Sequence, residues 1–461
     1  MKQPEIRLPD TKLWDHQLEA YHAGLHEEEI GYDAWMGTGK SAVAVHLCAN
    51  WEAEKVLILC PKAAFGVWRR EFARWCPVDY NMLVLDKWTS AVKADRLRRF
   101  MWDSGMKVVV INYQSAWRSG ISQELLAKEW DTVICDESQN IKSHGSKQSK
   151  QAWKVGKKSA RRVCLTGTPM ENSPLDVFGQ CRFLNEELFG WRWTKFQKSY
   201  CEFRRIPGVP VPVVSKIVNI DDLQKKFYSQ WHRIESDVLD LPKISHQVID
   251  CELSNKAARA YASLSRELIA EIDGGVITAD NALVKLLRLQ QITSGYIPEA
   301  LTGYLMHVDS SKQDALQMLV DGLPANESIV VFGRFSSDLM CAAEVAAVAG
   351  RPYLEVSGSR KDLTDHGTMT DMPGQILGVQ IDSGGAGIDL TAANYVCYFS
   401  VGFSRGKYDQ SLCRAHRPGQ DKPVFVYHLQ CRDTVDAYIF KALEEKADVV
   451  NEVLDLMRRS L

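Results

Sequence analysis

The order of apolar and polar positions predicts strands that alternate with helices over most of the chain. Short runs rich in Val, Ile and Leu recur, each of a length that suits one strand buried on both faces. They are residues 56–60, 108–111, 132–135, 162–165, 329–332, 353–356, 376–381, 395–399 and 424–429. Buried strands separated by helical stretches are typical of parallel sheets covered by helices. The pattern therefore predicts a doubly wound α/β fold.

The predicted strands form two groups, and a helical region lies between them. Residues 221–238, 255–272 and 279–292 have apolar positions at helical spacing. Residues 206–214 contain three prolines, which exclude a central strand and predict a loop or a sheet edge. We expect an N-terminal lobe over residues 1–172, a helical region over 173–310 and a C-terminal lobe over 311–461.

Composition narrows the class of protein. Of the 461 residues, 45% are hydrophobic and 25% are charged, as in ordinary globular proteins. The uncharged stretch 390–404 is too short to span a bilayer, and the N-terminus has no apolar core typical of a signal peptide. We therefore expect a cytoplasmic protein with no membrane partner. None of the 12 cysteines are three apart, so there is no Cys-x-x-Cys pair, and we expect free, buried thiols.

Residues 34–41, Ala-Trp-Met-Gly-Thr-Gly-Lys-Ser, contain the second half of a phosphate-binding loop. Gly37, Thr38 and Gly39 would turn backbone N–H groups toward phosphate oxygens. Lys40 would supply charge to the β- and γ-phosphates of ATP, and the Ser41 hydroxyl would bind magnesium. Ala34 stands where the general motif has Gly, so a glycine-rich turn before a helix remains the alternative.

Two carboxylates follow the predicted strand 132–135. Ligands bind at the carboxyl ends of parallel strands, so Asp136 is a candidate magnesium ligand and Glu137 a candidate general base for the attacking water. The alternative is a solvated acidic turn.

A basic segment lies near the C-terminal end, over residues 410–420. On a helix, Arg414 and Arg417 would share a face with Gln410. Their guanidinium groups could neutralise charge on the transferred phosphate. The alternative is an exposed basic helix end stopped by Pro and Gly.

These motifs, taken in order, resemble superfamily 2 helicase-like ATPases, and within them the Swi/Snf family of DNA translocases, in a minimal form of viral or bacterial type. Segments 13–17, 34–41, 59–62, 136–139, 165–169, 383–390 and 410–420 carry the resemblance. It implies two RecA-like lobes with ATP and magnesium between them. It also implies that Gln17 reads adenine, that Gly387 contributes to the nucleotide site, and that Lys62, Thr166 and Ser383 face DNA.

The chain departs from the family pattern at two places. Ala34 and Trp35 replace an acidic pair usual in the phosphate-binding motif, and Gln139 replaces the usual His after the acidic pair. Neither change removes a predicted magnesium ligand or the candidate base. The second leaves open how hydrolysis couples to the motif at 165–169.

Two basic surfaces are candidates for DNA binding. Lys142, Lys147 and Lys150 belong to a stretch, residues 139–162, with eight basic and no acidic side chains, and a stripe along a helix there would bind phosphates without sequence preference. Residues 191–205 interleave Arg and Lys with Trp, Phe and Tyr, which suits base stacking. A solvated charged face and core aromatics are the respective alternatives.

The sequence thus predicts an ATP-dependent motor that moves along duplex DNA without base specificity. A strand-separating DNA or RNA helicase is one alternative. A degenerate, nucleotide-gated DNA-binding module without turnover is the other.

Overall fold

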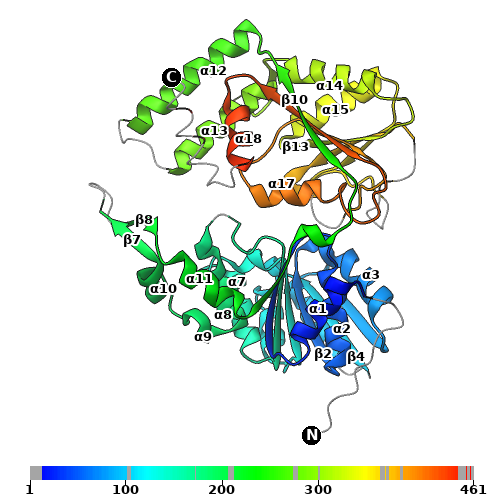
Figure 1. Ribbon diagram of the computed structural model, residues 1–461, viewed down its shortest axis with the longest axis vertical. Coiled ribbons are helices and arrows are strands. Elements are labelled where there is room, and N and C mark those ends of the chain that lie inside the picture. Colours follow the sequence, from blue (N-terminus) through cyan, green and yellow to red (C-terminus); the bar gives the residue numbers. More distant parts are fainter. Residues whose placement is uncertain are drawn as a thin grey trace. The chain divides into compact units, whose positions relative to one another are not determined.

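The computed structural model describes residues 13–100, 105–171, 173–205, 212–273, 279–299, 302–363, 369, 373–384, 388–444, 453 and 457 (Figure 1). The chain forms two compact units, Met1–Leu239 and Asp240–Leu461. The helical region expected between the lobes is divided between these units. No helix among the described residues has both the length and the apolar content to cross a membrane.

The first unit contains a parallel sheet of seven strands in the order β3-β4-β2-β5-β6-β1-β9. The strands are β1 (Glu29–Ala34), β2 (Lys55–Cys60), β3 (Tyr80–Leu85), β4 (Met106–Asn112), β5 (Thr132–Asp136), β6 (Arg161–Thr166) and β9 (Trp231–Ile234). The helices are α1 (Asp15–Gly24), α2 (Lys40–Asn50), α3 (Phe65–Trp75), α4 (Ser90–Phe100), α5 (Tyr113–Ala116), α6 (Ile121–Leu126), α7 (Lys147–Gly156), α8 (Val177–Leu184), α9 (Glu186–Phe189), α10 (Trp193–Tyr200) and α11 (Ile220–Tyr228).

Alternate residues of the central strands enter two separate cores, which explains their unbroken apolar runs. In β2, Val56 and Ile58 pack into the core with α1, α2 and α3. Leu57 and Leu59 pack into the opposite core with helices from α4 to α8. The strand is thus buried on both faces, as the sequence predicts.

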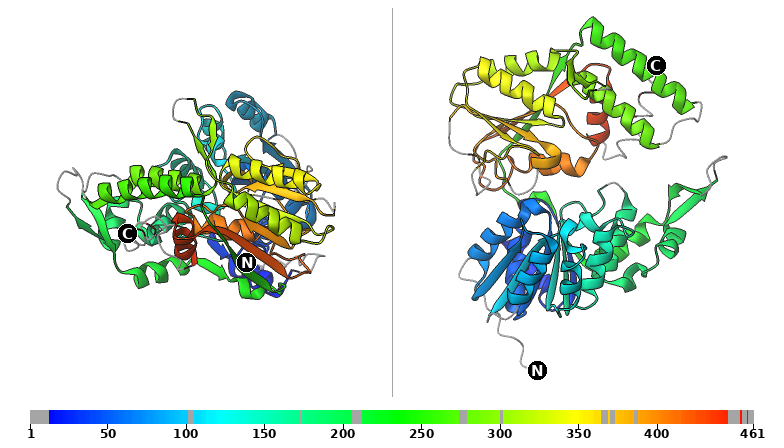
Figure 2. Two further views of the ribbon diagram at one scale, coloured as in Figure 1. Left: turned by 90° about the horizontal axis from the view of Figure 1, so that it is seen from above. Right: turned by 180° about the vertical axis from the view of Figure 1, so that it is seen from behind.

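The second unit repeats this arrangement around a parallel sheet of six strands, in the order β10-β17-β16-β13-β15-β14 (Figure 2). The strands are β10 (Ile244–Cys251), β13 (Ile329–Gly333), β14 (Tyr353–Val356), β15 (Ile376–Gln380), β16 (Tyr395–Tyr398) and β17 (Val424–Cys431). The helices are α12 (Asn255–Asp273), α13 (Ala279–Thr293), α14 (Ser311–Gly322), α15 (Ser336–Val348), α16 (Ile381–Gly384), α17 (Arg405–Leu412) and α18 (Val435–Glu444). Helices α14 and α15 cover one face, and α13, α17 and α18 cover the other. The predicted α/β fold with two parallel-sheet lobes is confirmed.

Two short antiparallel hairpins complete the described structure. Strands β7 (Cys201–Arg204) and β8 (Val213–Ile217) pair in the first unit, and β11 (Tyr296–Pro298) and β12 (Leu305–His307) pair in the second. The prolines at 207 and 210 lie outside the described residues.

The helix predicted over residues 221–238 is wrong in its second half. Helix α11 ends at Tyr228, and β9 follows and pairs with β1. Gly31 of β1 leaves space that the Trp231 ring fills, since a Cβ there would lie 2.2 Å from the ring. Pairing with the free edge of β1 therefore overrides the helical periodicity of this segment.

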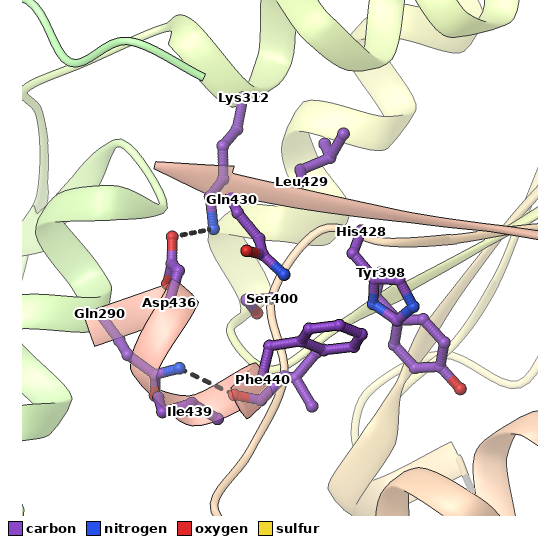
Figure 3. A pocket seen from close by; sticks show the side chains of 11 residues that line it. Gln290, Lys312, Tyr398, Ser400, His428, Leu429, Gln430, Asp436, Ile439 and Phe440 are labelled. Carbon is purple, nitrogen blue, oxygen red and sulfur yellow. Dashed lines mark hydrogen bonds and ion pairs between the residues drawn. The ribbon is translucent and has the colours of Figure 1, made fainter. Parts of the chain in front are cut away.

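A buried ion pair fixes the chain after the last strand of the second unit. Lys312 Nζ lies 2.7 Å from Asp436 Oδ2 (Figure 3). It also donates to the Phe399 carbonyl oxygen at 2.9 Å. Asp436 also accepts a bond from the Thr293 hydroxyl at 3.0 Å. Burial is the largest single effect on the pKa of Lys312 and would lower it, but the charge and hydrogen bond of Asp436, together with the charges of Cys431 and Asp338, outweigh burial and raise the pKa.

Candidate nucleotide site and nucleic-acid surface

The loop between β1 and α2 has the backbone that a phosphate-binding loop needs. Gly37 and Gly39 have φ angles of 88° and 81°, in the left-handed region that favours glycine. A Cβ on Gly39 would lie 2.1 Å from Gln17 Nε2. No side chain caps the N-terminus of α2, where Lys40 and Ser41 stand, so its first N–H groups can bind an anion.

Gln17 from α1 is bonded directly to this loop. Its Nε2 donates to the Thr38 carbonyl oxygen at 3.0 Å, and its Oε1 accepts from the Trp14 backbone N–H at 3.1 Å. His16 Nε2 lies 2.9 Å from the same carbonyl oxygen. The amide keeps one hydrogen and one lone pair for a base edge, which suits the predicted contact with adenine.

Asp136, at the end of β5, is buried and held in a fixed orientation. Its Oδ2 accepts a bond from Trp68 Nε1 at 2.9 Å, and its Oδ1 accepts from the Glu137 backbone N–H at 3.0 Å. Burial and the charge of Glu137 raise the pKa of Asp136, whereas the charge of Lys40 lowers it. The net effect is a raised pKa for Asp136.

These residues fit magnesium bound with a triphosphate. Magnesium usually takes one or two protein ligands, with phosphate and water oxygens completing its octahedron. Each Asp136 oxygen accepts one hydrogen bond and keeps a lone pair, and Ser41 adds a hydroxyl one residue after Lys40. No cluster of three or more His, Cys, Asp or Glu side chains suited to a metal occurs in the part of the chain that the structure describes. Magnesium that is bound mainly through phosphate and water oxygens does not need such a cluster, because a single carboxylate beside the phosphate loop is sufficient.

Glu137 is connected to the motif at 165–169 by a chain of hydrogen bonds. Gln139 Nε2 donates to Glu137 Oε2 at 2.9 Å, and Gln139 Oε1 accepts from the Thr166 hydroxyl at 2.7 Å. Thr166 Oγ1 in turn accepts from the Thr168 N–H at 3.0 Å. The Gln139 amide thus bridges the candidate base and Thr166, which is a role that the sequence alone did not reveal.

The ends of three adjacent strands, β1, β6 and β5, therefore supply the site. A Cβ on Gly167, after β6, would lie 3.1 Å from the carbonyl oxygen of Ala34 at the end of β1. Tyr113 further supports the end of β5 by donating to the Asp136 carbonyl oxygen at 2.8 Å. These contacts of Trp68 and Tyr113 with Asp136 were not predicted, because the partners are distant in sequence.

In the second unit, the helix expected to carry both arginines ends too early. Helix α17 carries Gln410 but stops at Leu412, and Arg414 and Arg417 lie in the turns that follow. The prediction that all three share one helical face is therefore wrong. The cause is local, because the N–H groups of Arg414 and Ala415 donate to the carbonyl oxygens of Ser411 and Leu412, three residues back, which replaces the α-helical pattern by tighter turns.

Arg417 has a donor that suits an oxyanion. Its Nε is buried and has no hydrogen-bond partner among the described residues. A buried N–H without a partner is costly, and an anion oxygen would satisfy it. The Arg414 carbonyl oxygen accepts from the Leu390 N–H at 3.0 Å, which ties this turn to the end of the segment 383–390. Gly387 lies outside the described residues, as does the Ser383 side chain.

The predicted DNA-facing residues differ in their surroundings. Lys142 is paired with Glu171 at 2.8 Å and Asp176 at 3.6 Å, and Lys62 is paired with Asp86 at 3.0 Å. Thr166 is buried in the hydrogen-bond chain described above. Lys147 and Lys150 lie on the exposed face of α7, where the Lys147 ammonium is 4.6 Å from the centre of the Trp117 ring. Lys62, Lys147 and Lys150 are all exposed, and of these three only Lys62 takes part in a salt bridge among the described residues.

Comparisons with known proteins agree with this arrangement. The family model described as the SNF2-related domain matches residues 17–295. Protein p41 of Acyrthosiphon pisum secondary endosymbiont phage 1 is 25% identical, over 92% of this chain and 94% of that protein. YwqA of Bacillus subtilis, named for ATP-dependent helicase/translocase activity, is 26% identical over 86% of this chain, which spans only 43% of YwqA.

Among solved structures, the Sulfolobus solfataricus SWI2/SNF2 ATPase core in complex with dsDNA is 22% identical. That match covers 96% of this chain and 92% of the other, with a TM-score of 0.44. The family assignment depends on the family model, which spans more than half of the sequence. The chain belongs to the SNF2-related domain family of helicase-like ATPases.

Proposed function

We propose that this protein is a DNA-stimulated ATPase that moves along duplex DNA without base specificity. The observation that carries the proposal is the hydrogen-bond chain Glu137–Gln139–Thr166 beside the phosphate loop. It joins the candidate base for hydrolysis to a motif on the DNA-facing side of the family pattern. An ATPase of this kind needs such a link if nucleotide state is to change the grip on DNA.

The proposed division of labour follows from the chemistry of each residue. The loop at Gly37–Ser41 binds the phosphates, and Gln17 binds the base. Magnesium, when bound through Ser41 and Asp136, would neutralise charge that develops on the phosphates. Glu137 accepts a proton from the attacking water, with its carboxylate oriented by Gln139.

The second unit is proposed to supply the remaining cations. Arg417 has a buried donor with no partner among the described residues, and Arg414 lies three residues before it. A guanidinium group that reaches the transferred phosphate is worth roughly 10³ to 10⁵ in rate in other phosphoryl-transfer enzymes. Arg417→Ala should therefore lower kcat far more than it raises KM for ATP.

The test is steady-state phosphate release with and without duplex DNA. Duplex DNA should raise turnover, and Lys40→Ala should abolish it. Lys256→Ala, which removes an exposed lysine on α12, serves as the matched control and should retain turnover. No turnover in the unmodified protein at saturating ATP and DNA would contradict the proposal and favour a binding module. Displacement of a labelled strand from a forked duplex would instead favour a strand-separating helicase.

A further inference from the structure

The hairpin of β7 and β8, together with α10, forms a basic arm that projects from the first unit (Figures 1 and 2). Between residues 190 and 218 there are six basic side chains and one acidic side chain. The basic side chains are Arg192, Lys195, Lys198, Arg204, Arg205 and Lys216. All six are exposed, and no salt bridge to any of them occurs within the described residues. The arm thus carries an excess of five positive charges, and its basic side chains form no salt bridge with the part of the chain that the structure describes.

The base of the arm is held firmly by the body of the first unit. Tyr200, at the end of α10, is buried and donates to Asp222 of α11 at 2.7 Å. The Val218 N–H donates to the Tyr200 carbonyl oxygen at 2.9 Å, and Asn219 Nδ2 donates to the Ser199 carbonyl oxygen at 2.7 Å. These bonds close both strands of the hairpin at its root, so the arm is a positioned element.

Both the hairpin and the segment before α10 expose apolar side chains that belong to no described core cluster. Phe203 of β7 pairs directly with Val214 of β8, and their exposed fractions are 43% and 40%. Trp191, before α10, is 53% exposed, and the Arg192 guanidinium lies 4.5 Å from its ring centre. A two-stranded hairpin gains little stability from such residues in water. Exposed rings among unpaired cations instead match surfaces on which bases stack while basic residues bind phosphates.

We propose that this arm is a second nucleic-acid contact, which binds unpaired nucleotides beside a duplex. The proposal rests on the proposed function and deepens it, because it names a DNA feature that the motor would encounter at an end, gap or fork. Base pairs inside a duplex are stacked on both faces, so along a duplex Phe203 and Trp191 find free base faces only where nucleotides are not paired. The cations would add affinity that falls with salt.

The experiment measures binding of the full chain to labelled DNA by fluorescence anisotropy, at about 50 mM and about 200 mM salt. The probes are a blunt duplex and the same duplex with a single-stranded overhang. Two variants of the arm are compared: Phe203→Ala, and the triple change Arg204→Gln, Arg205→Gln and Lys216→Gln. The control is Lys256→Gln, Arg259→Gln and Arg266→Gln on α12, which alters net charge equally. Thermal melting checks that each variant is folded.

The unmodified protein should bind the overhang duplex more tightly than the blunt duplex. Phe203→Ala should weaken overhang binding about tenfold, within the range for loss of one stacked base, and leave blunt binding unchanged. The triple variant should lower the slope of log affinity against log salt by about 2 on the overhang probe, since each lost phosphate contact on a single strand contributes about 0.7. The α12 control should change neither value.

Equal binding of both probes, or arm variants that bind the overhang as the unmodified protein does, would overturn the proposal. An arm that serves an acidic protein partner would give this second result. Phosphate release stimulated by blunt duplex separates the two levels of inference. If blunt duplex stimulates phosphate release but the arm variants bind the overhang normally, only the arm proposal fails. If blunt duplex does not stimulate phosphate release, the proposed motor function fails.

Discussion

Replacing Gln139 by leucine tests whether the hydrogen-bond chain at the candidate site acts in catalysis. Leucine has a similar size but neither donor nor acceptor, so the bonds to Glu137 at 2.9 Å and Thr166 at 2.7 Å are both lost. A hydrogen bond to a charged group is worth about 1.5–3 kcal/mol. If the Glu137 carboxylate must keep this orientation in the transition state, kcat should fall by about 10- to 150-fold.

The KM for ATP should change little, because Gln139 makes no contact with the phosphate loop among the hydrogen bonds described. The assay is phosphate release at saturating duplex DNA over a range of ATP concentrations, with thermal melting as the control for folding. Gln139→His, which keeps a donor and an acceptor, should lose less turnover than Gln139→Leu.

A double-mutant cycle with Thr166→Val isolates the bridge. If Gln139 couples Glu137 to Thr166, the second change should add little once the first is made, with a coupling energy of about 0.5–3 kcal/mol. Fully additive losses would show that the two residues act independently. An unchanged kcat in Gln139→Leu would refute the reasoning altogether.

Three further predictions concern binding and stability. Gly39→Ala should raise the Kd for a fluorescent ATP analogue by about 5- to 30-fold, because a side chain at a φ of 81° costs about 1–2 kcal/mol. Lys312→Met should lower the free energy of unfolding in urea by about 3–5 kcal/mol, since it leaves Asp436 buried without its partner, and adding Asp436→Leu should restore most of the loss. Burial, with a smaller effect of His246, lowers the pKa of His428 in the folded protein to about 3. In the unfolded chain the pKa of this histidine is about 6.5, so below that pH the unfolded chain binds a proton that the folded protein does not. Stability should then fall by about 2 kcal/mol from pH 6.5 to 5, and His428→Phe should flatten that part of the urea-stability profile.

The strands predicted most accurately are those buried on both faces. Residues 56–60 and 329–332 have no polar interruption, because each side chain enters a core, and burial alone defines them in the sequence. Strand β10 was not predicted, because most of its residues are exposed. It is an edge strand whose residues 245–248 are exposed, including Val248 at 49%, so its sequence has no apolar pattern. Its position depends on pairing with β17, which no local pattern encodes.

The candidate site shows the same limit. The glycines at 37 and 39 and the carboxylates at 136 and 137 were predicted from local chemistry, because each depends on a few adjacent residues. The bond from Trp68 to Asp136 spans 68 positions, and the bond from Thr166 to Gln139 spans 27. Such contacts follow from which strands are neighbours in the sheet. The prediction that Arg414 and Arg417 lie on a helix was wrong for a different reason. Local hydrogen bonds at Leu412 end α17 before the helix reaches either arginine.

Gln139 can make the same two kinds of hydrogen bond as the histidine that is usual at this position. In the family pattern this position is usually His, whose ring can donate from one nitrogen and accept at the other only while it is neutral. An amide also donates and accepts, and it does so at any pH. In this chain it uses both groups at once, toward Glu137 and toward Thr166. The substitution therefore keeps both hydrogen bonds of the bridge and removes only their dependence on pH. A degenerate module that had lost the coupling would instead lack the bridge.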